Sequence, residues 1–93
     1  MIISFGSEET EKIWNGIIVK KPSIEIQQSG RRELRMLNNS QDLKDLRIPP
    51  SNRLEKLNGT FKDFCSIKIN DQWRIIFIWK DGNATAVEIT DYH

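Results

Sequence analysis

The sequence contains few of the residues that build metal centres and disulfide frameworks. Among 93 residues there is one cysteine, Cys65, and one histidine, His93. A single cysteine excludes an intramolecular disulfide, and one cysteine with one histidine is too few for a structural zinc site. No glycine-rich phosphate loop, nucleophile elbow or dinucleotide fingerprint is present. The sequence therefore predicts no metal and no cofactor, and it favours a reducing, cytoplasmic location.

Long apolar runs are also missing. No stretch approaches the roughly 18 apolar residues of a transmembrane helix. The first residues, MIISFGSEETEK, lack a basic region followed by a long apolar run, so we expect no secretory signal. Hydrophobic residues make up 38% and charged residues 29%, a balance typical of a globular protein. We expect one domain over residues 1–93, with no membrane partner.

The net charge of +1 is unevenly distributed. Residues 20–74 hold 12 of the 14 Lys and Arg but 7 of the 13 Asp and Glu. A basic middle with acidic ends suggests a positive face for an anion. A solvated helix with ordinary strand edges explains the same pattern, and composition alone favours that simpler interpretation.

The pattern of apolar residues predicts an α+β fold: two N-terminal helices packed on a mainly antiparallel sheet of four to five strands. Ser7 and Ser23 are expected to start the helices, and Ser40 to cap a short turn after the second. The expected strands are, in chain order, 1–5, 53–57, 64–70, 73–79 and 84–89. In the strand from residue 64, alternation predicts that Cys65 points inward and that Ser66 points outward.

Arg74 stands in the most apolar strand, WRIIFIWK. A buried charge is costly unless it is paired or faces a groove. One interpretation is an arginine that projects from a concave sheet and grips a phosphate. The other is a structural ion pair with Asp71, Glu88 or a helix acid, and sequence physics leaves the two about even.

The sequence places a carboxylate, a phenol and the only imidazole together as Asp91, Tyr92 and His93. Such a set is suited to proton transfer. A chain end is more often a solvated terminus, which is the simpler interpretation. Cys65 is expected to be a core residue rather than a nucleophile.

Three segments together resemble a known family. The strings RLEKLNG, SIKINDQWRIIFIW and VEITDYH, preceded by a two-helix half, resemble the RelE/ParE superfamily of toxins, and within it the HigB branch with its GraT-like members. The resemblance covers essentially the whole chain. It implies a ribosome-dependent mRNA endonuclease that cuts the codon in the A site and contacts rRNA and mRNA. It also implies a HigA-like antitoxin with a helix-turn-helix domain, through which alone the toxin would reach operator DNA.

The resemblance also assigns site residues. Arg74 matches the phosphate-binding arginine of the family, and the last three residues match its terminal motif. Many HigB proteins read LHPLKG where this chain has 54–59, so that Glu55 stands in place of a catalytic-type histidine and Asn58 in place of a lysine. Glu55 could act as a base or orient His93. The expected catalytic set is Arg74, Asp91, Tyr92, His93 and Glu55, and the expected RNA-binding set is Arg53, Lys56, Asn58, Lys68, Arg31 and Arg32, on or next to one concave sheet face.

Two other functions fit the same superfamily. A ParE-like protein would inhibit DNA gyrase through protein contacts without cutting RNA, and a degraded toxin would only bind its antitoxin. The terminal motif and Arg74 favour the nuclease, because ParE-type proteins generally lack such a proton-transfer set.

Overall fold

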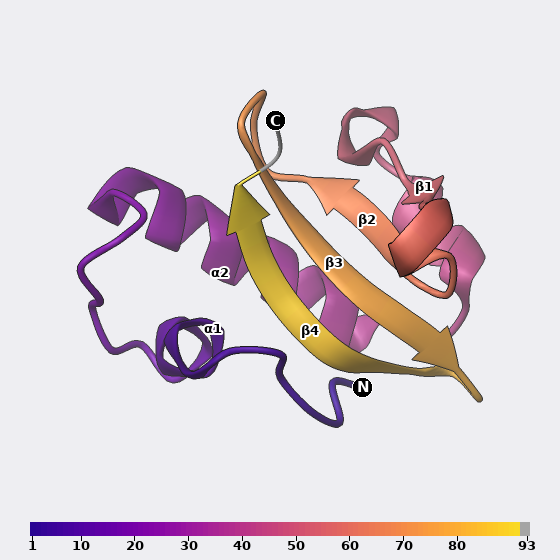
Figure 1. Ribbon diagram of the computed structural model, residues 1–93, viewed down its shortest axis with the longest axis horizontal. Helices are drawn as coiled ribbons and strands as arrows, with labels where there is room; N and C mark the ends of the chain where they lie inside the picture. The colour runs from indigo at the N-terminus through magenta and orange to yellow at the C-terminus, as the bar shows by residue number, and fades with distance from the viewer. Residues whose placement is uncertain (92–93) are drawn as a thin grey trace.

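A computed structural model describes residues 1–91 and shows two helices and a four-stranded antiparallel sheet (Figure 1). The strands lie in the order β1-β2-β3-β4. The predicted α+β class is therefore confirmed. In chain order the elements are α1 (Glu8–Trp14), α2 (Ile24–Asn39), the short 3-10 helices η1 (Leu43–Arg47) and η2 (Pro50–Asn52), β1 (Glu55–Lys56), the 3-10 helix η3 (Gly59–Phe61), β2 (Cys65–Lys68), β3 (Trp73–Lys80) and β4 (Asn83–Asp91).

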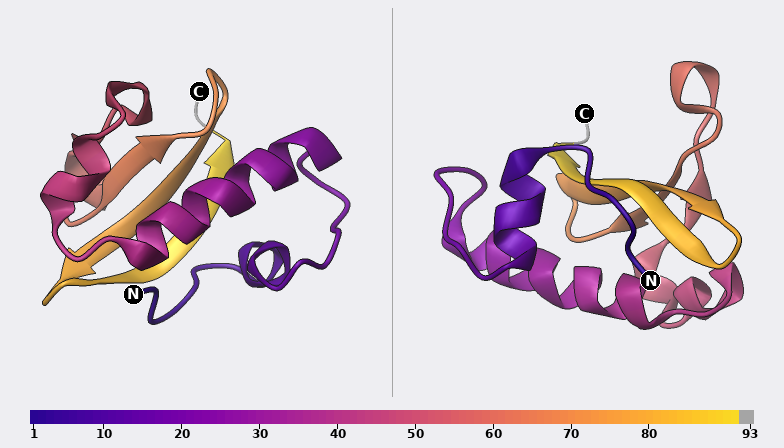
Figure 2. Two further views of the ribbon diagram at one scale, coloured as in Figure 1. Left: turned by 180° about the vertical axis from the view of Figure 1, so that it is seen from behind. Right: turned by 90° about the horizontal axis from the view of Figure 1, so that it is seen from below.

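The sheet has one face buried under α2 (Figure 2). Leu34 and Leu37 of α2 are fully buried, as are Ile67, Ile75 and Phe77 of the sheet. Because successive strand residues point to opposite faces, the residues that alternate with these lie on the face turned away from α2, which we call the open face. The paired strands place on it Glu55, Ser66, Lys68, Arg74, Ile76, Glu88 and Thr90. No helix within residues 1–91 is long and apolar enough to cross a membrane.

Both helices begin at the predicted serines. The Ser7 Oγ accepts a hydrogen bond from the Thr10 amide at 3.2 Å, and the Ser23 Oγ accepts one from the Ile26 amide at 3.4 Å. Gly30 interrupts the apolar stripe of α2, although glycine costs about 1 kcal/mol in a helix relative to alanine. A Cβ at this position would lie 3.0 Å from the Ile89 side chain, so the glycine permits close packing of α2 on the sheet.

The predicted strand at residues 1–5 is wrong. The segment runs beside β4 and makes only two isolated parallel bridges, from Ile2 to Ala84 and from Phe5 to Val87. Between them the backbone of Ala86 takes a φ of 52° and its amide donates to the Ser4 Oγ at 2.9 Å. The irregular backbone of β4 there breaks the ladder that a regular fifth strand would need.

Two other local predictions also need correction. Of the strand expected at 53–57 only Glu55–Lys56 forms, because Arg53 adopts the left-handed conformation with a φ of 46°. Ser40 does not cap the following turn, since its Oγ donates to the Met36 carbonyl at 2.8 Å. Asp42 caps η1 instead, with its Oδ1 accepting from the Lys44 amide at 3.0 Å.

Glu33 on α2 provides a prediction about stability. Its Oε2 is buried and has no hydrogen-bond partner within residues 1–91, and burial raises the pKa of its carboxyl, against the opposing charge of Arg32. A raised pKa in the folded state means that stability falls as the pH rises from the unfolded pKa through the folded one. Glu33→Gln is therefore expected to raise the free energy of unfolding at pH 7 by about 1 kcal/mol.

The measurement is urea unfolding of both proteins at pH 7 and at pH 3.5. At the lower pH the Glu33 carboxyl is protonated in both states, so the two proteins should have nearly equal stability. An equal gain at both pH values would show that the effect does not arise from the carboxylate charge.

Candidate active site

Arg74 is the second residue of β3, and its side chain lies on the open face. Lys68 on β2 and Thr90 on β4 are its Cα partners on either side. Only 7% of Arg74 is exposed, so the surrounding side chains and loops enclose most of a residue that the sheet directs away from the core.

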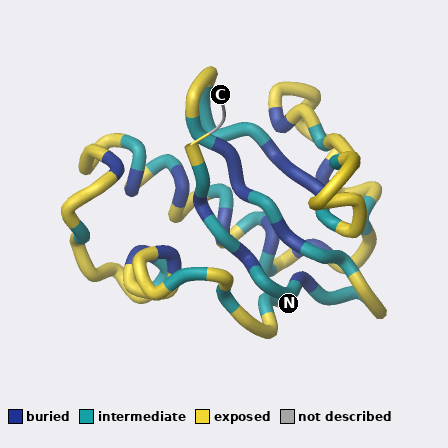
Figure 3. Tube along the Cα trace, in the orientation of Figure 1, coloured by how far each residue is buried: buried dark blue, intermediate teal, exposed yellow. Residues whose placement is uncertain are grey.

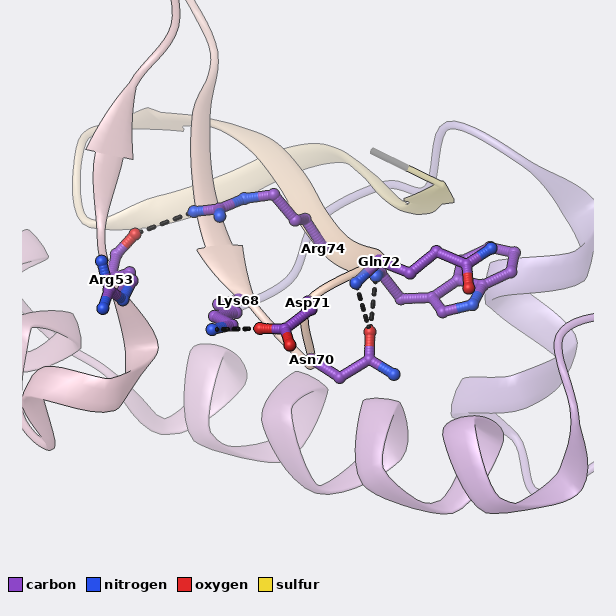
Figure 4. A network of polar contacts seen from close by, with 7 residues as sticks. Arg53, Lys68, Asn70, Asp71, Gln72 and Arg74 are labelled. Atoms are coloured by element: carbon purple, nitrogen blue, oxygen red, sulfur yellow. Dashed lines mark hydrogen bonds and ion pairs between the residues drawn. The ribbon is translucent and has the colours of Figure 1, made fainter. Parts of the chain in front are cut away.

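Among residues 1–91, two neutral oxygen atoms accept hydrogen bonds from the guanidinium of Arg74, and Figure 4 shows the bond to Arg53. The Arg74 Nε donates to the Ser66 Oγ at 2.8 Å, and the Arg74 Nη2 donates to the Arg53 carbonyl at 2.9 Å. Both acceptors are neutral, so these two bonds orient the guanidinium without neutralising its charge. The Glu55 Oε2 lies farther away, 3.9 Å from the Arg74 Nη2, and about half of the Glu55 side chain is exposed.

The Arg53 carbonyl is positioned by the loop that precedes β1. Asn52 is 2% exposed, and its Nδ2 donates to the Leu46 carbonyl at 3.1 Å. The next residue, Arg53, takes the left-handed conformation that closes η2. A buried amide and a tight turn thus place a backbone acceptor beside Arg74, and neither contribution was predicted from the sequence.

Asp71 and Glu88, which the sequence suggested as ion-pair partners of Arg74, interact with other charged residues. Asp71 forms an ion pair with Lys68, whose Nζ lies 2.9 Å from the Asp71 Oδ1. The pKa of Asp71 is lowered by the hydrogen bond and charge of Lys68, with a smaller contribution from the charge of Arg53. Burial raises the pKa of Glu88, and the neighbouring charge of Glu9 raises it further. Glu55, whose Oε2 lies 3.9 Å from the Arg74 Nη2, was not among the ion-pair partners that the sequence analysis considered.

The structure brings together three of the predicted cations. Arg74 and Lys68 are neighbours on the open face, and Arg53 is near enough to Asp71 for its charge to lower the pKa of that carboxyl. Figure 4 shows all three around the start of β3. The Lys68 side chain is 27% exposed.

Lys56 does not join this group, which corrects the expected single concave face. The register of β1 pairs Glu55 with Ser66 and Lys56 with Cys65. Since neighbouring strand residues point to opposite faces, Glu55 lies beside Arg74 and Lys56 lies on the side of Cys65. Consistently, the charge of Lys56 acts on the Cys65 thiol, although burial is the larger effect and raises the pKa of that thiol.

Arg31 and Arg32 lie on α2, in the layer behind the sheet (Figure 2). The guanidinium of Arg31 lies close to Gly16, at the end of α1, and the Arg32 Nη2 donates to the Ser29 Oγ at 3.3 Å. Neither is on the open face. Asn58 is exposed and precedes η3 without capping it through its side chain.

The last strand ends next to Arg74. Asp91 is the Cα partner of Trp73, the residue before Arg74, and its Oδ2 accepts from the Gln72 Nε2 at 3.1 Å. The turn that carries Gln72 is held by Asn70, whose Oδ1 accepts from the amides of Gln72 and Trp73 at 2.8 and 2.7 Å. Tyr92 and His93, both predicted to be catalytic, lie outside the described residues.

Ser66 is a site residue that the sequence analysis missed. Strand alternation predicted an outward-facing serine, and the direction is right, yet Ser66 is fully buried because the Arg74 side chain lies over it. The available signal was a small hydroxyl residue on the strand next to a lone arginine. Cys65 is 6% exposed, which agrees with its predicted place in the core. Within residues 1–91 no three His, Cys, Asp or Glu side chains are grouped to hold a metal ion.

Two helices pack on an antiparallel sheet, and an arginine is held on the face turned away from α2. This arrangement is consistent with RelE-like toxins. A sequence model of RelE-like toxins of type II toxin–antitoxin systems, described as HigB, matches residues 15–93. The chain belongs to this family of HigB-like toxins.

Two curated proteins are similar to part of the chain. Toxin HigB-1 of Vibrio cholerae is 53% identical over 53 residues, which are 57% of this chain and 56% of that protein. A protein of Haemophilus influenzae, named only as uncharacterized, is 38% identical over 53 residues, or 57% of this chain and 52% of that protein. The matched region thus spans about half the length of each relative.

Proposed function

We propose that this chain is the toxin of a type II toxin–antitoxin pair and that it cleaves mRNA in the ribosomal A site. Membership of the HigB-like family supports the first part. The observation that carries the second is the orientation of Arg74, which Ser66 and the Arg53 carbonyl hold on the open face. A charged, pre-oriented donor on a sheet face is suited to a phosphate.

The reaction is attack by a ribose 2′-OH on the adjacent phosphate. The new bond joins the 2′ oxygen to phosphorus, the bond to the 5′ oxygen breaks, and the products carry a 2′,3′-cyclic phosphate and a 5′-OH. A base must accept the 2′ proton, a cation must stabilise the charge on phosphorus oxygens in the transition state, and an acid must protonate the 5′ oxygen.

The residues near Arg74 match these needs. Arg74 supplies positive charge to the phosphate, with Lys68 and Arg53 close by. Glu55 is a carboxylate beside the guanidinium and is a candidate for the base. Asp91, Tyr92 and His93 complete the proposed proton-transfer set, because β4 ends opposite the residue before Arg74.

The proposed partners follow from the same chemistry. The ribosome and its mRNA are polyanions, which the cations of the open face would attract. A helix-turn-helix antitoxin would neutralise the toxin in the cytoplasm and would carry the pair to its operator DNA.

The test is to map mRNA 5′ ends after brief induction of the toxin. New 5′-OH ends inside codons, which disappear when translation initiation is blocked, are expected. Growth arrest with unchanged mRNA and altered DNA supercoiling would instead indicate a gyrase inhibitor. If induction does not arrest growth, the chain only binds antitoxin.

The strand register provides a matched pair of lysine variants. Lys68→Gln is expected to lower the rate of mRNA cleavage about tenfold, because it removes a cation from the face of Arg74. Lys56→Gln, on the opposite face, is expected to change the rate less than twofold. Cleavage of mRNA on purified ribosomes measures both, and equal losses would contradict the assignment of the open face.

A further inference from the structure

An apolar surface lies around the segment that joins α1 to α2. Ile17, Ile18 and Ile24 are 53%, 70% and 56% exposed, a high exposure for three neighbouring isoleucines. They line a groove of about 200 Å³ together with Arg31. A second hollow of about 430 Å³ shares Ile17 and Ile18 with the first, so the two form one continuous surface.

This segment is held in place although it has no regular secondary structure. Gln27 of α2 is 7% exposed, and its Oε1 accepts from the Val19 amide at 3.0 Å. Its Nε2 donates to the carbonyls of Val19 and Pro22 at 2.8 and 2.7 Å. Exposed isoleucines on a preorganised segment lose little conformational entropy when a partner covers them.

The rim of the surface is basic. Arg31 lines the groove, and the cations of the second hollow are Lys12, Lys20 and Lys21. Within residues 1–91 the ion pairs are Lys68 with Asp71 and Arg74 with Glu55. None of the four cations on the rim therefore forms an ion pair among the described residues. Glu9 is the one acid among the described residues that line the two hollows.

We propose that this surface, which we call the loop surface, binds an amphipathic acidic segment of the antitoxin. The loop surface consists of Ile17, Ile18 and Ile24 with the cations Lys12, Lys20, Lys21 and Arg31. Apolar side chains of the segment would cover the isoleucines, and Asp or Glu beside them would meet the cations. The choice of the antitoxin rests on the proposed function.

Charge decides between the possible occupants. A second copy of this chain would bring like-charged rims together, which disfavours self-association. RNA would satisfy the cations but would leave the isoleucines uncovered. No residue that lines the two hollows is on the open face, so binding at the loop surface and the chemistry at Arg74 can be separated by mutation.

Two equally exposed isoleucines allow a matched test. Ile18→Asp places a carboxylate at the centre of the loop surface. The control, Ile48→Asp, places one outside that surface, at a residue that is 74% exposed and lies on the connector between η1 and η2. The dissociation constant is measured by calorimetry with the purified antitoxin of the proposed pair. Ile18→Asp is expected to weaken binding at least about 30-fold and Ile48→Asp less than twofold.

A second variant tests the charge. Arg31→Glu is expected to weaken antitoxin binding and to flatten its dependence on salt, because it removes one attraction and adds a repulsion. Circular dichroism checks that each variant is folded. Equal binding by wild type, Ile18→Asp and Arg31→Glu would overturn the proposal.

The same variants separate this proposal from the proposed function. Ile18→Asp should still cleave mRNA on ribosomes at the wild-type rate while escaping the antitoxin. Loss of cleavage with unchanged antitoxin binding would show that the loop surface contacts the ribosome and would overturn the proposal. If wild type never cleaves mRNA yet Ile18→Asp loses the antitoxin, the proposed function fails and the docking surface stands.

Discussion

Replacing Arg74 by alanine is expected to lower mRNA cleavage by about 10²- to 10³-fold, the usual cost of losing one good donor to transition-state charge. The loss should fall mainly on the cleavage step, because negative charge on the phosphate oxygens increases as the 2′ oxygen attacks. Ribosome binding should weaken much less, since other cations share that task. Single-turnover cleavage on programmed ribosomes separates the two effects.

A lysine variant tests the geometry of Arg74 rather than its charge alone. Lysine cannot donate to the Ser66 Oγ and the Arg53 carbonyl in the fork arrangement that arginine provides, so Arg74→Lys should recover little activity. If Arg74→Ala unfolds the protein, or fails to bind antitoxin, then the arginine is mainly a structural partner of Glu55 and of the two oxygens.

The architecture was predictable where the sequence carries a strong periodic or capping signal. Both helix starts follow from a serine ahead of acidic or apolar helical positions, and β3 follows from a continuous apolar run. Residues 1–5 were misassigned because apolar, β-branched residues predict a strand whatever pairing is available. Only the fold shows that β4 is irregular at Ala86 and pairs with this segment at two points.

The site was predictable in its residue types but not in its arrangement. Arg74 stood out because a charge within an apolar strand needs an explanation. The separation of Glu55 from Lys56 depends on strand register, and a shift of one residue exchanges the two faces. Asn52 and the Arg53 carbonyl support Arg74 from a tight turn that precedes a two-residue strand. The alternation of apolar and polar residues does not predict the conformation of such a turn.

For the loop surface too, the sequence showed the residue types but not how the fold groups them. The sequence analysis assigned Arg31 to RNA binding, and the structure shows it as an exposed cation on α2. The fold places it with exposed isoleucines on another side of the molecule, where an acidic amphipathic protein segment is a better chemical match than a phosphate backbone.

In the proposed cleavage reaction, two variants identify the base that accepts the 2′ proton. His93→Gln is expected to lower cleavage by about 10²- to 10⁴-fold, the range that a positioned acid or base contributes. The reason is chemical: His93 is the only imidazole in the sequence, and an imidazole with an ordinary pKa of about 6.5 exchanges protons near neutral pH. Glutamine keeps polarity and similar size but cannot carry the proton.

Glu55→Gln is the comparison variant, because Glu55 is the carboxylate whose Oε2 lies 3.9 Å from the Arg74 Nη2. If His93 transfers the proton, the wild-type rate should change between about pH 5.5 and 7.5, Glu55→Gln should keep that dependence, and His93→Gln should lose it. Antitoxin binding should be unchanged in both variants, since the loop surface includes neither residue. Wild-type cleavage by His93→Gln, together with a large loss in Glu55→Gln, would assign the base to Glu55.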